Sequence, residues 1–128
     1  MSSMKKAITS SDAPKPVGPY SQAVQAGNFL FISGQIAIDS KTNQLAASDI
    51  TAQTRQVLEN IKVIAQTAGY SLADVIQTTV YLSSMTLFAD FNREYAKYFK
   101  VDYPARATIA CQLKEGVLVE VSAVAYKE

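Results

Sequence analysis

Histidine is absent from the sequence, and cysteine occurs once, as Cys111. Histidine is the commonest general base and metal ligand of proteins, so its absence excludes Ser-His-Asp and Cys-His catalysis and ordinary zinc sites. A single cysteine excludes an internal disulfide. Any chemistry must therefore use carboxylate, guanidinium, tyrosine, hydroxyl, backbone or water.

The chain also lacks an excess of charge of either sign, with 12 lysines and arginines against 11 acidic residues. No overall field attracts nucleic acid or an anionic membrane. No apolar run is long enough to cross a bilayer, and no signal-like apolar stretch follows the N-terminal lysines. We expect a cytoplasmic protein without nucleic-acid or membrane partners, in which residues 1–4 are disordered or an extension.

Cofactor-binding patterns are missing as well. The sequence shows no phosphate-binding glycine loop, no dinucleotide fingerprint and no cluster of metal ligands, so we expect neither cofactor nor metal. What is present is typical of a globular protein, with 128 residues of which 48% are hydrophobic. We therefore expect one domain over residues 1–128 with a single core.

Periodicity predicts a mixture of strands and helices. Apolar residues recur at helical spacing from a cap at Ser48 or Asp49 to Ala68, before the stop signal Gly69. An aromatic stripe predicts a second helix over Thr86–Phe99, with its aromatic side chains in the core. Strands are predicted at 5–9, 29–38, 75–82, 106–113 and 117–126.

The last predicted strand is apolar on both faces, and two helices can cover only one face of a sheet. One face carries Val117, Val119, Val121, Ala123 and Ala125, and the other carries Leu118, Val124 and Tyr126. An antiparallel sheet normally leaves its second face polar. The second apolar face therefore predicts self-association, with subunits packing sheet to sheet.

Two charges in the C-terminal segment are the first candidates for a site. Arg106 opens a strand directly after a proline, and Glu120 lies within a β-branched run where a carboxylate is costly to bury. A tight turn at 114–116 places them on adjoining strands. They either form a site that binds an anion beside an acid, or neutralise each other as a buried ion pair.

Three further positions each allow a functional and a structural interpretation. Gly34, next to Ser33 inside a strand, marks either a ligand notch or a bulge that curves the sheet. Tyr20, after a proline-bracketed loop, either contacts a ligand or covers the core. Asn92, at the margin of the aromatic stripe, is either a ligand contact or a solvated amide.

Several motifs in order resemble the RidA family, also called the YjgF/YER057c/UK114 family, over nearly the whole chain. They are GPYSQA at 18–23, FISGQI at 31–36, QTRQVLENI at 53–61, PAR at 104–106 and VEV at 119–121. The resemblance implies an α+β, chorismate-mutase-like subunit in which two helices pack on one face of a mixed β-sheet. It also implies a homotrimer with a ligand cleft at each subunit interface.

The resemblance further implies a cofactor-independent hydrolase, a 2-iminobutanoate/2-iminopropanoate deaminase that converts enamines and imines such as 2-aminoacrylate to 2-oxo acids and ammonia. Arg106 would hold the substrate carboxylate and Glu120 would position the attacking water. The substrate would also be contacted by Tyr20, Ser33, Gly34, Asn92, Ala107 and Thr108. A regulator that only binds a metabolite in the same cleft is the alternative, and a ribonuclease is disfavoured by the absent histidine and the balanced charge.

The chain departs from the family pattern at three points. Relatives often carry cysteine where this chain has Thr108, and the second acid of their last motif is Ser122 here. The turn that is commonly leucine-proline-lysine reads Leu113-Lys114-Glu115. Glu120 is retained, so hydrolysis remains the expectation, but the altered turn leaves the preferred side chain of the substrate open.

Overall fold

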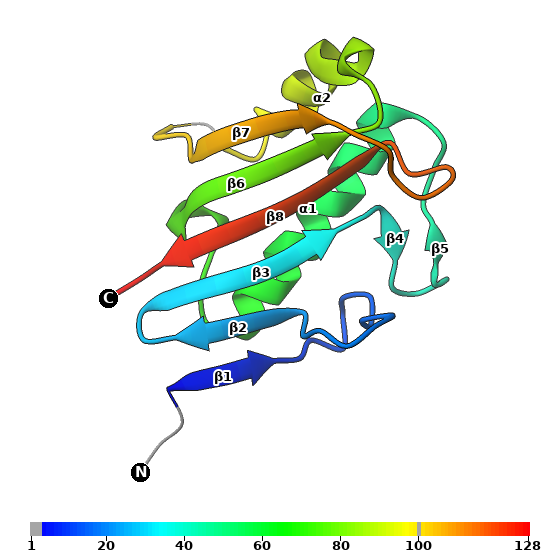
Figure 1. The fold of residues 1–128 in the computed structure, drawn as a ribbon. Coiled ribbons are helices and arrows are strands. Elements are labelled where there is room, and N and C mark those ends of the chain that lie inside the picture. The colour runs from blue at the N-terminus through cyan, green and yellow to red at the C-terminus, as the bar shows by residue number, and fades with distance from the viewer. Residues whose placement is uncertain (1–3, 100) are drawn as a thin grey trace.

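The computed structural model describes residues 4–99 and 101–128. Its main feature is a six-stranded sheet with the strand order β1-β2-β3-β8-β6-β7 (Figure 1). Only β6 and β7 are parallel, and the other neighbours are antiparallel. The strands are β1 Lys5–Ile8, β2 Ala23–Ala26, β3 Phe29–Gln35, β6 Val75–Leu82, β7 Ala105–Ala110 and β8 Val119–Tyr126, with a small hairpin of β4 Ile38–Asp39 and β5 Gln44–Leu45.

The long helix α1 spans Ile50–Thr67 and was correctly predicted from its apolar spacing and its end signals. The Asp49 side chain caps it by accepting a hydrogen bond from the Ala52 N–H at 3.1 Å. Gly69 follows its C-terminal end with a φ of 86°, in the left-handed region that favours glycine. A 3-10 turn, η1 (Leu72–Asp74), then leads into β6.

The second helix is shorter than predicted. A 3-10 turn, η2 (Met85–Leu87), precedes α2, which spans only Phe88–Tyr95. After the helix the chain turns, and the Tyr98 hydroxyl donates to Glu59 on α1 at 2.8 Å. Phe91, Tyr95 and Phe99 are buried as expected, but Phe88 is 36% exposed, so the stripe is not wholly core.

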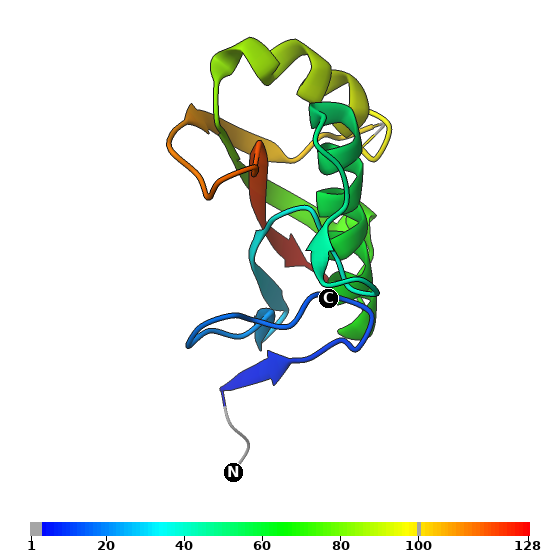
Figure 2. The ribbon, with the colours of Figure 1, turned by 90° about the vertical axis from the view of Figure 1, so that its right-hand side faces the viewer.

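Both helices cover the same face of the sheet (Figure 2), which confirms the α+β class with two helices on one side of a mixed sheet. Beneath α1, the inward side chains of β8 are buried at Val119, Val121, Ala123 and Ala125. No helix within residues 4–99 and 101–128 is both long and apolar enough to cross a membrane. The expectation for residues 1–3 lies outside the described residues.

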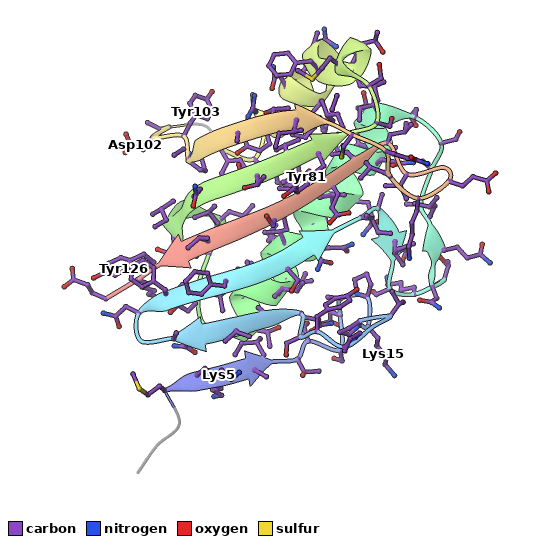
Figure 3. All side chains as sticks on the ribbon, in the orientation of Figure 1. Lys5, Lys15, Tyr81, Asp102, Tyr103 and Tyr126 are labelled. Carbon is purple, nitrogen blue, oxygen red and sulfur yellow. The ribbon has the colours of Figure 1, made fainter. Side chains whose placement is uncertain are left out.

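The other face of the sheet is open and partly apolar, as the sequence predicted. Figure 3 looks onto this face, where Tyr81 and Tyr126 are labelled. Phe29 contacts Tyr126 at 4.9 Å between ring centroids, and neighbouring Phe31 is 48% exposed. Further exposed apolar side chains on or beside this face are Ile76 and Ile109. No part of the chain that the structure describes covers them.

The strand order corrects one prediction. We expected the turn at 114–116 to place the strand of Arg106 beside the strand of Glu120, but β6 lies between β7 and β8. The turn itself is present, with the Val117 N–H donating to the Lys114 carbonyl at 3.0 Å. The chain reaches β7 from β6 by a crossover through α2, and such a strand-helix-strand unit pairs its two strands in parallel.

Candidate functional site

Arg106 projects from β7 toward the helical side of the sheet. It is aligned with Thr78 of β6, whose side chain is buried and reaches α2. The Arg106 guanidinium carbon lies 4.9 Å from the ring centroid of Tyr95, 5.5 Å from that of Phe91 and 5.7 Å from that of Phe88. Three aromatic rings thus hold the cation by cation–π attraction without neutralising it.

Tyr95 is itself fixed beneath the guanidinium. Its hydroxyl shares a hydrogen bond with the Thr78 hydroxyl at 2.8 Å. Burial raises the pKa of Tyr95 above the ordinary 10.0, although the Thr78 hydrogen bond and the charge of Arg106 oppose the rise. The phenol therefore stays neutral, and the Arg106 cation keeps its charge for an external anion.

Asn92 lines the same cavity as Arg106 and leaves a polar atom unused. The cavity measures about 330 Å³ and its wall also includes Tyr103, which lies beside the start of β7 (Figure 3). The Asn92 side-chain oxygen Oδ1 is buried and has no hydrogen-bond partner among the residues that the structure describes. Because an unpaired buried acceptor costs free energy, this atom favours the interpretation of Asn92 as a ligand contact.

Glu120 of β8 lies on the opposite face of the sheet, where its register partner is Tyr81 of the neighbouring strand β6. Its carboxylate lies against Gly34 so closely that a Cβ added at that glycine would overlap Glu120 Oε2. Gly34 falls within a register shift between Ile32 and Gln35 of β3. The glycine therefore marks a bulge, as one interpretation of the sequence held, and also leaves room for the acid, whereas the ligand notch stays a prediction.

A second cavity of about 370 Å³ surrounds Glu120. Tyr20, Ser33 and Gly34 line it, as expected of substrate-binding residues. Tyr20 is 49% exposed, so it covers the cavity rather than the core. The remaining lining residues are Val17, Ile36, Lys114 and Val117.

The loop that carries Tyr20 is held by one buried amide. The Gln22 Nε2 donates to the carbonyls of Ser10, Ala13 and Pro14 at 3.2, 3.4 and 2.9 Å, and its Oε1 accepts from the Ser10 N–H at 2.6 Å. Ser33 ties the end of the loop to β3 by donating its hydroxyl to the Ser21 carbonyl at 2.6 Å. Because the hydroxyl proton of Ser33 is used in this bond, its oxygen can only accept a hydrogen bond from a ligand.

Another buried amide, Gln53 of α1, positions the chain just before Glu120. Its Nε2 donates to the Ala47 and Gly116 carbonyls at 2.9 and 2.8 Å, and its Oε1 accepts from the Leu118 N–H at 2.9 Å. Farther along the helix, the Asn60 Nδ2 donates to the Ile36 and Ile38 carbonyls at 3.2 and 2.9 Å. Gln53 and Asn60 of the 53–61 motif are therefore structural supports for the Glu120 cavity.

Arg106 and Glu120 do not meet within one chain. No ion pair among residues 4–99 and 101–128 joins them, so the alternative of a buried ion pair is wrong. They line two separate cavities on opposite sides of the sheet. Ala107 and Thr108 line neither cavity, and exposed Ala107, opposite Thr79, lies on the open side away from Arg106.

Tyr95, Tyr103, Lys114 and Val117 are among the cavity residues that sequence reasoning missed. Tyr95 was assigned to the core only, and Tyr103 was read as part of a connection. Lys114 and Val117 flank the turn before β8, and both line the Glu120 cavity. The departure of Lys114 from the common turn sequence was the one signal that pointed to this wall of the cavity.

The chain is similar to known proteins in both sequence and structure. Residues 10–127 match the model of a family described as Endoribonuclease L-PSP, also known as the YjgF/RidA family. A RutC family protein from Pyrococcus horikoshii is 57% identical over 126 residues, covering 98% of this chain and 100% of the relative. A 2-iminobutanoate/2-iminopropanoate deaminase from Salmonella typhimurium is 38% identical over 128 residues, covering 97% and 99%. The crystal structure of the YjgF gene product from E. coli superimposes with a TM-score of 0.90 at 36% identity, covering 96% and 99%.

Proposed function

The chain belongs to the YjgF/RidA family, and on this premise we propose that it hydrolyses 2-imino and 2-enamino acids, such as 2-aminoacrylate, to 2-oxo acids and ammonia. The observation that carries the proposal is the pair of complementary cavities. One offers a guanidinium that rests on an aromatic base and forms no ion pair among residues 4–99 and 101–128, and the other offers a carboxylate in a partly enclosed pocket. The guanidinium suits the carboxylate of an electrophilic substrate, and the carboxylate suits the water molecule that attacks it.

The two cavities form one site only if they come from different chains. Arg106 and Glu120 face opposite sides of the same sheet, so no small ligand can touch both within one subunit. A cyclic homotrimer built on the open apolar face brings the Arg106 side of one subunit to the Glu120 side of the next. Each of its three interfaces then contains one complete site.

The reaction begins with binding of the substrate carboxylate. Arg106 donates two parallel hydrogen bonds to it, and the aromatic rings beneath the guanidinium fix the direction of approach. The free Oδ1 of Asn92 accepts from an N–H group at the same end of the ligand. Tyr20 of the adjoining subunit covers the other end. The imine carbon is thereby held over Glu120.

Glu120 then acts on water. As the water oxygen bonds to the imine carbon, Glu120 accepts a proton from the water and passes it to the imine nitrogen, which gives a carbinolamine. Transfer of the hydroxyl proton through Glu120 to the amino nitrogen then accompanies cleavage of the carbon–nitrogen bond, so that ammonia and the 2-oxo acid leave and the carboxylate is regenerated. An enamine enters the same sequence after a proton adds to its terminal carbon. No redox step occurs.

The test is a coupled assay in which a serine/threonine dehydratase supplies 2-aminoacrylate and ammonia release is followed. The wild type should accelerate ammonia release over the uncatalysed rate, and Arg106→Ala should abolish the acceleration while the oligomer survives. Unchanged activity in Arg106→Ala would contradict the assignment. Retained oxo-acid binding without hydrolysis of any imine would instead favour a metabolite-binding regulator in the same cleft.

A further inference from the structure

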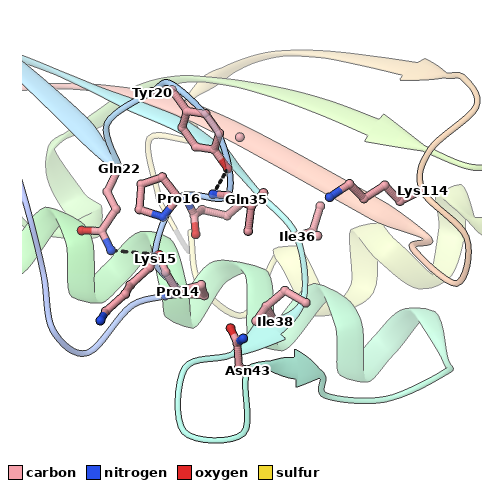
Figure 4. A pocket seen from close by; sticks show the side chains of 12 residues that line it. Pro14, Lys15, Pro16, Tyr20, Gln22, Gln35, Ile36, Ile38, Asn43 and Lys114 are labelled. Carbon is pink, nitrogen blue, oxygen red and sulfur yellow. Dashed lines mark hydrogen bonds between the residues drawn. The ribbon is translucent and has the colours of Figure 1, made fainter.

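A recess of about 160 Å³ opens beside the Glu120 cavity (Figure 4). The two spaces are continuous, because five residues line both of them: Val17, Tyr20, Gly34, Ile36 and Lys114. A ligand whose reacting carbon lies at Glu120 can therefore extend its side chain into the recess. The residues of the recess decide which side chains fit.

Lys114 gives the recess its charge. Figure 4 shows the Lys114 ammonium directed into the space toward Ile36, whereas the Lys15 ammonium points away from it. None of the described residues that line the recess is acidic. None of the ion pairs among residues 4–99 and 101–128 includes Lys114. The recess thus presents a cation without a protein counter-ion.

The backbone of Lys114 is fixed, so its exposed side chain starts from a defined position at the rim of the recess. The Lys114 carbonyl accepts from the Val117 N–H at 3.0 Å and closes the turn. Gln53 holds the following residues by bonds to Gly116 and Leu118 at 2.8 and 2.9 Å. A proline at this position, common in relatives, would leave the recess apolar on this wall.

We propose that Lys114 makes this site select 2-imino acids whose side chain ends in a carboxylate. The inference rests on the proposed function, because it assumes that the reacting carbon lies at Glu120. A dicarboxylic substrate would place its first carboxylate on Arg106 of the adjoining subunit and its second on Lys114. Without Lys114 the second carboxylate would face only the like charge of Glu120, which disfavours binding.

The experiment compares two imines of similar size in the full-length protein. A flavin amino-acid oxidase, with catalase present, generates the imines of glutamate and of norvaline, together with that of alanine as a check of basal activity, and semicarbazide traps whatever is not hydrolysed. The wild type should show the higher kcat/KM with the glutamate-derived imine. Lys114→Met should lower the ratio of the two kcat/KM values by about tenfold, as expected for the loss of one charge-assisted hydrogen bond. Lys114→Arg should keep the ratio within about twofold.

Lys15→Met is the matched control, because Lys15 lines the same recess but points away from it. Its ratio should also stay within about twofold. Equal ratios in wild type and Lys114→Met, with the alanine-derived imine still hydrolysed, would overturn the role of Lys114 and leave the proposed function intact. Failure of the wild type to hydrolyse any of the three imines, the alanine-derived one included, would instead overturn the proposed function.

Discussion

The carboxylate of Glu120 occupies the space where Gly34 has no side chain. The overlap that a Cβ at Gly34 would make involves the far end of the Glu120 side chain rather than backbone. The φ of Gly34 lies outside the left-handed region, so an L-residue can adopt the backbone there. Glycine is therefore needed at position 34 because of the Glu120 side chain on the neighbouring strand, and not because of the backbone conformation.

Gly34→Ala should displace Glu120 without unfolding the protein. The carboxylate can swing away, so the free energy of unfolding should fall by about 1 kcal/mol or less, whereas kcat should fall at least about tenfold because the base is misplaced. Chemical denaturation and the dehydratase-coupled assay measure the two effects. In the double variant Gly34→Ala/Glu120→Ala, the first change should add no loss to that of the second. Additive losses would show that Gly34 acts by another route.

Mixing two inactive variants tests whether each site spans two chains. Arg106→Ala lacks only the guanidinium, and Glu120→Gln lacks only the base. In randomly mixed trimers prepared at equal amounts, about one quarter of the interfaces should combine an intact Arg106 with an intact Glu120, so about a quarter of wild-type activity should return. Refolding the two proteins together and separately provides the comparison. No recovery in verified mixed trimers would place the whole site within one chain.

Local elements were predictable from sequence because their signals are local. Asp49 and Gly69 mark the ends of α1, and the β-branched run of β6 was predicted with its observed bounds. Strand order was not predictable in the same way. The short turn at 114–116 favours two neighbouring strands, whereas β6 pairs with both β7 and β8 and lies between them. The strand-helix-strand order through α2 was the overlooked signal, since it requires a parallel pair.

The candidate site was predictable as a set of residues but not as an arrangement. The placement of two charges in the C-terminal segment named Arg106 and Glu120, and the motif resemblance agreed. Which side of the sheet each faces depends on register, however, and a shift of one residue reverses it. Tyr95 looked like core because its ring is buried, and only the contact with Arg106 shows its second role. The resemblance implied a cleft at a subunit interface, but sequence alone did not show which side of the sheet carries each half of the site.

Phe31→Glu should separate the subunits. Phe31 is 48% exposed on the open face and adjoins Val24 and Val124 across the neighbouring strands. A charge there is tolerated in a monomer but costly at a sheet-to-sheet interface. Light scattering should report a lower mass, and activity should disappear with the trimer. Met85→Glu, at a side chain 49% exposed on η2, is the control that should leave the mass unchanged. An intact Phe31→Glu trimer would show that another surface joins the subunits.

Tyr95→Phe distinguishes the role of the Tyr95 ring from the role of its hydroxyl. The ring beneath Arg106 remains, so KM should change little, but the buried Thr78 hydroxyl loses its partner. The free energy of unfolding should fall by about 1 to 3 kcal/mol. Thr78→Val should cost a similar amount alone, and the double variant should cost less than the sum. Tyr95→Leu should in addition raise KM. Additivity of the two single changes would contradict a direct hydroxyl pair.

Glu94 should make the free energy of unfolding depend on pH in the acid range. Burial acts to raise the pKa of this carboxyl, but hydrogen bonds and charges from Lys97 and Arg55 outweigh it and hold the pKa below the ordinary 4.5. A group whose pKa is depressed on folding stabilises the native state above its unfolded pKa and loses that contribution as pH falls through the folded value. Glu94→Gln should therefore lower the free energy of unfolding by about 1 kcal/mol at pH 7, and the difference should shrink below pH 4.5.

Asp90→Asn, which breaks the exposed pair with Arg93, should show a smaller difference throughout, measured by urea unfolding at each pH. A difference for Glu94→Gln that persists undiminished in acid would mean that shape, and not charge, holds this side chain in place.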